Sequence, residues 1–423
     1  MARPLRGFRG YGPSVLCLLL TLAFAQERAD RAGRWYPARP ALSHPAPADV
    51  QQLQALGYLG AYEAPTGTTG TWASGEEVPG YVLLSSGHRP EARIVDRGGH
   101  VHHRWALPFA ASFPQSSPAA QGHVSANSWR AVEPLPNGGL LAVHEGLGVV
   151  ALDADSSRLW SYLDGAHHEV FVDDDGSVWS LTRSVQRRGH TPVLEDHLTH
   201  RAADGRLLDT HDLLAALEAS PWASWIDPAV EGVPGDWLHT NSVHRLKGPA
   251  YHPSFEAGRF LLSMRHLDAL LVYDATERRM VWASRGVWAR QHDAQQGPSG
   301  RLWLFDNRGA GKGHSQVLAL DPAQPARVVW RWGAEEGLHS QVLGAVQELP
   351  GGHVLVTEST AGRCLEVTPD GRVVWTYTHP ETVAGPKGPL MAAVFSCRWL
   401  PPDHATIQAL SLPGQAPATT KPL

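Results

Sequence analysis

The sequence predicts an all-β fold, a six-bladed β-propeller with four-stranded blades and a short N-terminal extension. The main observation is a motif that occurs six times at an interval of roughly 45–50 residues, as propeller repeats do. Each copy has a turn Gly, an apolar strand, a second strand that often contains Asp, and a strand that ends in Trp. The composition agrees, because 42 Gly, 33 Pro and 16 Trp in 423 residues are typical of a turn-rich β protein.

The first 25 residues are predicted to be a secretory signal peptide. Arg3, Arg6 and Arg9 form a basic start, the apolar run that follows is too short to span a bilayer, and residues 23–25 match an A-x-A cleavage pattern. An uncleaved anchor is the alternative. We therefore expect a secreted or periplasmic protein with no integral membrane segment after cleavage, since no other apolar run is long enough.

Cleavage would remove three Arg and no acidic residue, so the net charge would change from −5 to −8. No basic block remains, and nucleic acid is therefore not an expected partner. The mature chain keeps Cys364 and Cys397. These could pair in an exported protein, and two free thiols are equally compatible with the sequence. The oligomeric state does not follow from the sequence.

Residues 26–79 are expected to form the N-terminal extension. Apolar residues at helical spacing predict one short helix at Ala48–Leu59. The extension could supply the inner strand of the first blade, or it could close the ring on the last blade. Residues 80–400 are assigned to the propeller and residues 401–423 to a Pro-rich C-terminal tail.

The six copies of the motif define the predicted blades. The third copy opens at Asp175–Arg183 and has no clear last strand, and an inserted helix is expected at Asp209–Ala219. A short strand precedes most copies, as at 168–172, 242–246 and 345–349. The other five copies end at Trp105, Trp160, Trp282, Trp330 and Trp375.

Polar residues recur where one blade leads into the next. The Trp marks the outermost strand, so the residues after it cross one face of the ring toward the central channel. In four consecutive connections these residues include histidines, whereas the first connection has Ser125 and Asn127. The histidines are His167, His168, His239, His292 and His339.

The second strand of each blade should end at the same face. Its last residues include Arg183, Arg265, Asp306 with Asn307, and Glu358 with Ser359 in successive copies. We therefore expect a cluster at the mouth of the channel. Its members would be His168, His239, Asn241, Arg265 and His292.

Imidazoles combined with a guanidinium indicate an anion site. Arg presents a fixed fork of donors to a tetrahedral oxyanion, and neutral His is a base or nucleophile near neutral pH. Such a site suits sulfuryl or phosphoryl transfer. A metal site is the competing interpretation, although no close H-x-x-x-H or H-E-x-x-H pair supports it. The simplest alternative is that a repeat places similar residues at similar positions.

Five short motifs together resemble the arylsulfate sulfotransferase family, over residues 75–400. The motifs are Gly165-Ala166-His167-His168, Asp236-Trp237-Leu238-His239-Thr240-Asn241-Ser242-Val243, Ser263-Met264-Arg265, Gln291-His292-Asp293-Ala294 and Leu304-Phe305-Asp306-Asn307. Members of this family are exported bacterial six-bladed propellers that use no nucleotide sulfate donor. The resemblance implies an aryl sulfate donor, a phenol acceptor, and neither a metal nor another cofactor.

The resemblance also implies roles for individual residues in a ping-pong reaction. His292 matches the histidine that becomes sulfated, His239 and Arg265 match residues that hold the sulfuryl oxygens, and Asn241 matches a polar support. His168 is the expected working residue of the double-His motif. Its neighbour His167, together with Asn307 and His339, is expected to contact substrate. Glu169 departs from the pattern, where Asp is expected.

Two other functions remain compatible with the sequence. One is a non-catalytic propeller that binds a ligand or a protein through the same rim. The other is a quinone- or metal-dependent propeller oxidoreductase, because repeats that end in Trp also occur in those enzymes. The repeat here lacks a clear signature for stacking such a cofactor.

Overall fold

The computed structural model describes residues 62–63, 69–188, 191–228, 235–248, 252–311, 313–385 and 388–413. The expected signal peptide (residues 1–25) and the expected helix at Ala48–Leu59 lie outside the described residues. Within these residues the chain is built almost entirely of antiparallel sheets, which confirms the predicted all-β propeller class.

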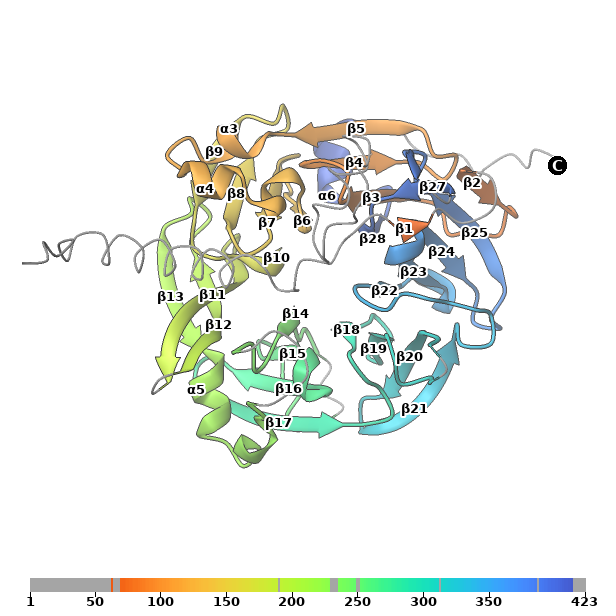
Figure 1. Cartoon of the computed structure of the whole chain (residues 1–423). Helices are drawn as coiled ribbons and strands as arrows, with labels where there is room; N and C mark the ends of the chain where they lie inside the picture. Colours follow the sequence, from red (N-terminus) through yellow and green to blue (C-terminus); the bar gives the residue numbers. More distant parts are fainter. Residues whose placement is uncertain are drawn as a thin grey trace, which may run out of the picture.

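Within the described residues, six sheets of four or five strands follow one another around a central axis (Figure 1). The second sheet combines β6 (Ala131–Pro134), β7 (Leu140–His144), β8 (Gly148–Leu152) and β9 (Arg158–Tyr162). The third combines β10 (His167–Val172), β11 (Val178–Arg188), β12 (Thr191–Arg201) and β13 (Leu207–Asp212). The next two combine β14 (Thr240–Arg245), β15 (Phe260–Met264), β16 (Ala269–Asp274) and β17 (Arg279–Arg285), then β18 (His292–Gln296), β19 (Leu302–Asp306), β20 (Gln316–Asp321) and β21 (Gln324–Trp332).

The remaining two sheets close the ring, because each takes a strand from the opposite end of the chain. The last sheet orders β22 (Ala345–Glu348), β23 (Val354–Glu358), β24 (Arg363–Val367), β25 (Val373–Thr378) and, at its outer edge, β2 (Gly70–Ala73). The first sheet takes its innermost strand from the C-terminal β28 (Val394–Leu400), beside β3 (Tyr81–Ser86), β4 (Glu91–Val95) and β5 (Val101–Ala106). The N-terminal segment therefore extends the last sheet, and the inner strand of the first sheet comes from the C-terminus.

The Trp that ends most copies of the motif ties its sheet to the next one. The indole Nε1 of Trp105 donates to Gly138 O at 3.2 Å, and that of Trp160 donates to Ala203 O at 3.1 Å, each in a turn of the following sheet. Trp330 and Trp375 make the same contact, with Pro369 O at 3.0 Å and Arg97 O at 2.8 Å. The repeated Trp thus combines apolar burial with a hydrogen bond between sheets.

The third copy of the motif uses other residues for this purpose. The expected helix at Asp209–Ala219 is shorter, because β13 continues to Asp212 and α5 spans only Leu213–Glu218. The side chain of Asp212 caps α5 by accepting from Ala215 N at 2.9 Å. Beside it, His211 Nδ1 lies 3.1 Å from Tyr273 Oη of the next sheet. This imidazole–phenol contact stands where other copies have the Trp.

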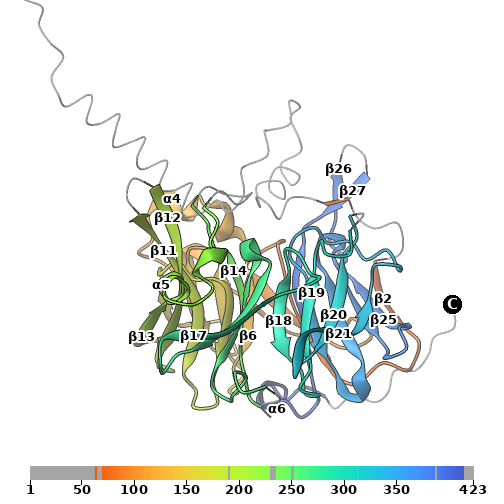
Figure 2. The same ribbon diagram turned by 90° about the horizontal axis from the view of Figure 1, so that it is seen from below.

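Short elements cover the two faces of the ring. On one face lie α3 (Phe109–Ser112), α4 (Pro118–Gln121), η2 (Val124–Asn127) and a small sheet of β1 (Tyr62–Glu63), β26 (Val383–Gly385) and β27 (Gly388–Met391). On the other face lies α6 (Ala405–Ala409), within the segment expected as a tail (Figure 2). Ile407 of α6 is buried in the core of the first two sheets, so this part of the tail packs on the ring.

The Cys364–Cys397 disulfide joins β24 of the last sheet to β28 of the first, across the point where the ring closes. It spans 33 positions in sequence, and closing a loop of this size restricts the unfolded chain. We expect the Cys364→Ala/Cys397→Ala variant to lose about 3–4 kcal/mol of unfolding free energy. Urea unfolding followed by Trp fluorescence measures this loss.

The matched control for this prediction is dithiothreitol. It should destabilise the wild-type protein and leave the double-alanine variant unchanged. If the unfolding midpoint of the wild-type protein is the same with and without dithiothreitol, the disulfide does not stabilise ring closure.

Candidate functional site

The innermost strands of the six sheets surround a cavity of about 400 Å³ on the ring axis. At the beginnings of these strands the wall carries Arg130, His168, Glu169, Asn241, His292 and Asp293. Toward the other ends of the strands it is lined by Glu133, Arg245 and Arg398. The cavity is therefore lined by the rim that the repeat pattern predicts, together with residues that the pattern does not single out.

Bulges at the start of three inner strands turn these side chains toward the axis. The pairing register shifts between His167 and Val170 in β10, between Thr240 and Ser242 in β14, and between His292 and Gln295 in β18. His168, His239 and Asp293 adopt positive φ values of 54°, 49° and 50°. Bulges and left-handed residues of this kind re-aim side chains and are frequent next to functional sites.

His292 is held in one tautomer by Asn307. The Asn307 amide nitrogen donates to Ser340 O at 2.7 Å and to Leu343 O at 2.6 Å, which identifies the other amide atom as oxygen. That Oδ1 lies 2.7 Å from His292 Nδ1, and Arg290 O lies 3.1 Å from the same nitrogen. Both neighbours are acceptors, so His292 Nδ1 carries the proton. The lone pair of the neutral ring is then on Nε2.

The pKa of His292 lies well below its usual range. Burial is the largest cause, the positive charges of Arg265 and Arg130 add to it, and the Asn307 hydrogen bond acts in the opposite direction. His292 is therefore a neutral imidazole at neutral pH, with a lone pair that is available for attack.

His239 is oriented by Asp236. The Asp236 carboxylate lies 2.6 Å from His239 Nδ1 and accepts the His239 backbone N–H at 3.1 Å. The carbonyl of Asp236 is 2.6 Å from Nδ1 of His266, so one residue positions two imidazoles. The Arg265 backbone N–H donates to His239 O at 3.1 Å. Burial and then the charge of Arg265 hold the pKa of His239 well below its usual range.

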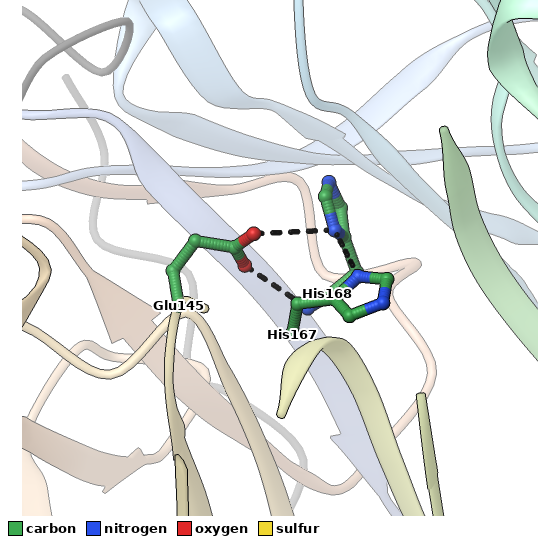
Figure 3. Close-up of side chains that lie close together, drawn as sticks. All are labelled: Glu145, His167 and His168. Carbon is green, nitrogen blue, oxygen red and sulfur yellow. Dashed lines mark hydrogen bonds and ion pairs between the residues drawn. The ribbon is translucent and has the colours of Figure 1, made fainter. Parts of the chain in front are cut away.

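The double-His motif forms a second buried network (Figure 3). Nδ1 of His167 lies 2.9 Å from Nδ1 of His168, so one of these nitrogens donates to the other. Glu145 accepts the His168 backbone N–H at 3.0 Å and lies 3.3 Å from both His168 Nδ1 and Arg183 Nη2. Burial and then the charge of Arg130 hold the pKa of His168 well below its usual range.

Among the described residues, two groups of buried side chains have the composition of a cation site. They are Glu145, His167 and His168, and Asp236, His239 and His266; within each group the ligand atoms lie within 4.8 Å of one another. Imidazole and carboxylate ligands of this kind suit Zn or Cu. Both groups consist of the imidazole–carboxylate pairs around the cavity, so a cation would bind at this same site.

Most of the site residues expected from the sequence come together here. His168, Asn241 and His292 line the cavity, whereas His239, Arg265, His167 and Asn307 are buried beside it. Asn241 Nδ2 donates to Gln291 O at 2.8 Å, next to His292. Asn307 contacts His292 and does not line the cavity, so its position is that of a supporting residue.

His339 is the one expected site residue that the fold keeps away from the cavity. It is exposed, with Nδ1 2.6 Å from Gly313 O and its backbone N–H donating to Glu358 at 2.7 Å. The reason is the length of its connection. His339 precedes β22 by several residues, whereas His292 is the first residue of β18. The intervening segment crosses the face of the ring and supplies the carbonyls of Ser340 and Leu343 to Asn307.

Four residues in or beside the cavity were given no role at the site from the sequence. Arg130 directly precedes β6, as His239 directly precedes β14. This equivalent position could have identified Arg130 from the sequence, but the sequence pattern indicates Ser125 and Asn127 as the counterparts of the histidines in that connection. Glu145 lies at the end of a second strand, where Arg265 and Asn307 also lie. The carboxyls of Glu169 and Asp293 face the cavity; burial raises their pKa values to about 8 and about 6.

Solved structures with similar chain paths share little sequence with this protein. A Bacteroides caccae protein of unknown function is 12% identical with a TM-score of 0.47, covering 71% of this chain and 94% of its own. A streptogramin B lyase is 12% identical (TM-score 0.42; 80% and 97% covered), and the Dos1 propeller is 11% identical (TM-score 0.39; 80% and 83% covered). With TM-scores below 0.5, these likenesses carry no functional argument. No curated protein matches the chain.

The described residues contain no helix with the length and apolar character needed to span a bilayer.

A family model described as arylsulfotransferase (ASST) matches residues 133–380, which is more than half of the 423-residue chain. The matched segment contains the networks around His168, His239 and His292. The chain therefore belongs to the arylsulfotransferase family.

Proposed function

We propose that this protein moves a sulfuryl group from an aryl sulfate ester to a phenol by a ping-pong reaction through a sulfohistidine at His292. The observation that carries the proposal is the fixed tautomer of His292, a residue that lines the cavity: Asn307 holds its Nδ1, which leaves the lone pair on Nε2 for attack. The family match supports sulfotransferase chemistry in general.

In the first half-reaction, the Nε2 lone pair of His292 attacks the sulfur of the donor. The bond between sulfur and the ester oxygen breaks, and the phenolate leaves with the electron pair. The sulfated imidazole carries a positive charge that is shared with Nδ1. The Nδ1–H to Asn307 Oδ1 hydrogen bond stabilises this charge, because it strengthens as the ring becomes cationic.

The sulfuryl oxygens would be held by His239, Arg265 and His168. Arg265 and His239 are two of the groups whose charges act on His292, and both are buried. An arriving anion offsets the arginine charges that depress the pKa of His239, so the imidazole can take up a proton at Nε2 while Asp236 holds Nδ1. When His167 donates to His168 Nδ1, His168 presents Nε2–H as a donor.

In the second half-reaction, a phenol replaces the released product. Its oxygen attacks the same sulfur, the N–S bond breaks, and the electron pair returns to His292 Nε2. The proton lost by the acceptor balances the proton gained by the phenolate of the first step. The enzyme returns to its starting state with no cofactor consumed.

We also propose that the mature chain works outside the cytoplasm. The basic and apolar N-terminal pattern is the sequence basis for export. The Cys364–Cys397 disulfide supports it, because disulfides persist in oxidising compartments.

The first prediction concerns the covalent intermediate. The purified protein mixed with a chromogenic aryl sulfate should gain one sulfuryl group on His292, because no acceptor is present to remove it. Intact mass detects the adduct, and added phenol should discharge it and accelerate release of the chromophore. The His292→Ala variant should show neither adduct nor turnover.

Two controls separate the competing functions. A chelator should not change the rate, whereas the cation-site interpretation of the buried His–carboxylate groups requires a loss. An absence of adduct and turnover across several aryl sulfates in the wild-type protein would favour the non-catalytic binding propeller instead.

The second prediction tests Asn307. The Asn307→Ala change removes the acceptor that fixes the His292 tautomer, so kcat should fall by about 10–100-fold. The KM for the donor should change little, since Asn307 does not line the cavity. Steady-state kinetics with varied donor measures both. A rise in KM at unchanged kcat would instead make Asn307 a substrate-binding residue.

The third prediction concerns pH. Only neutral His292 attacks, and its lowered pKa keeps it neutral, so the acid limb of kcat/KM should lie below pH 6.5. Arg265→Gln removes the largest charge that lowers this pKa. The acid limb should then move to higher pH, whatever the loss in absolute rate.

Arg301→Gln is the control for this shift, because Arg301 is exposed in the turn between β18, which begins with His292, and β19. It should leave the pH profile in place. If the acid limb of kcat/KM lies at the same pH in Arg265→Gln as in the wild-type protein, His292 is not the titrating group.

A further inference from the structure

Arg130 is a buried cation that forms no ion pair with the described part of the chain, although the carboxyl groups of Glu169 and Asp293 line the same cavity. The residue is 7% exposed and lines the cavity, and its Nε has no hydrogen-bond partner. The guanidinium lies over the ring of Phe395, at 5.6 Å from the centroid. Among the described residues, no carboxylate forms an ion pair with it. A buried charge of this kind is costly unless something pairs with it, so the site is built to receive an anion.

The order of the sheets places Arg130 across the cavity from His292. The inner strands follow one another around the axis as β28, β6, β10, β14, β18 and β22 (Figure 1). Arg130 directly precedes β6 and His292 begins β18, three sheets away in a ring of six. Both residues therefore lie at the same end of the cavity and on opposite walls.

The charge of Arg130 acts more strongly on His168, on the adjacent wall, than on His292, on the opposite wall. It is the largest charge that lowers the pKa of His168, which belongs to the sheet next to Arg130. For His292 the effect of Arg130 is smaller than that of Arg265. The two guanidinium charges therefore act at different positions. Arg265 acts near the proposed nucleophile, and Arg130 acts on the far side of the space that the sulfuryl group would fill.

Group transfer to His292 requires the attacking and leaving atoms to be roughly in line. The leaving oxygen then lies on the side of the sulfur away from His292, which is the wall that carries Arg130. The ester oxygen gains negative charge as its bond to sulfur breaks, and the same oxygen position is occupied by the attacking phenol in the second half-reaction.

We propose that Arg130 is a further catalytic residue, whose guanidinium binds the phenolate oxygen that leaves the donor and the phenol oxygen that attacks from the acceptor. This inference rests on the proposed function, because it assigns the position opposite the nucleophile of that reaction. The ring of Phe395 lies beside the guanidinium, and Arg130 lines the cavity, where its charged N–H groups would bind the oxyanion.

The test compares donors that differ in the basicity of the phenol they release. The series is 4-nitrophenyl, phenyl and 4-methylphenyl sulfate, and kcat/KM for the donor reports the first half-reaction alone. Arg130→Gln should lower kcat/KM by about tenfold for the nitrophenyl ester and about 100-fold or more for the methylphenyl ester. The better leaving group carries its own charge, so it depends less on Arg130.

Two further variants complete the design. Arg130→Lys keeps the charge without the fork and should give an intermediate dependence on the leaving group. Arg158→Gln, an exposed Arg in β9 of the same sheet, should give the wild-type dependence. Thermal unfolding of each variant shows whether it is folded, and the Arg130→Lys series decides the outcome if Arg130→Gln does not fold.

The outcomes separate the inference from the function on which it rests. An equal loss for all donors would overturn the role of Arg130 at the leaving oxygen, while turnover and the sulfohistidine of the wild type would still support the proposed function. Wild-type protein that releases no phenol from any donor would overturn the proposed function, and the inference with it.

Discussion

The structure depends on the packing of each sheet against the next around a closed ring. A four-stranded sheet has two apolar faces, and only neighbours on both sides remove them from water. The indoles of Trp105, Trp160, Trp330 and Trp375 each reach the following sheet with a hydrogen bond. The last contact closes the ring, because Trp375 near the C-terminal end meets the turn at Arg97. The Cys364–Cys397 disulfide covers the same joint.

Ring closure also determines the electrostatics of the site. Six inner strands begin around one narrow cavity, so side chains far apart in sequence are buried together. Burial and the neighbouring arginines depress the pKa values of His168, His239 and His292. The result is a set of neutral imidazoles with cationic guanidiniums, which attracts an anion and leaves His292 unprotonated. Carboxylates support the imidazoles: Asp236 contacts Nδ1 of His239, and Glu145 accepts the backbone N–H of His168.

The backbone repeats from sheet to sheet more regularly than the side chains at equivalent positions do. His292 begins its strand and reaches the cavity, whereas His339 lies in a longer connection and is exposed. Arg130 occupies the start of the second sheet, where the first connection folds into short helices before β6. Equivalent positions around the ring therefore carry different groups: the imidazole of His292 on one wall and the guanidinium of Arg130 on the opposite wall.

The sequence by itself determined the fold class, the Trp-ended strands and most members of the site, because the period of the repeat is local and hydrophobic patterning survives in each copy. It also singled out His168, His239, Asn241, Arg265 and His292. The tertiary structure alone decided how the ring closes, which nitrogen of His292 carries the proton, and which polar residues stand opposite one another. These depend on contacts between residues such as His292 and Asn307, or on the order of six strands about an axis. No spacing along the chain encodes such cross-ring distances, since they arise only when the last sheet meets the first.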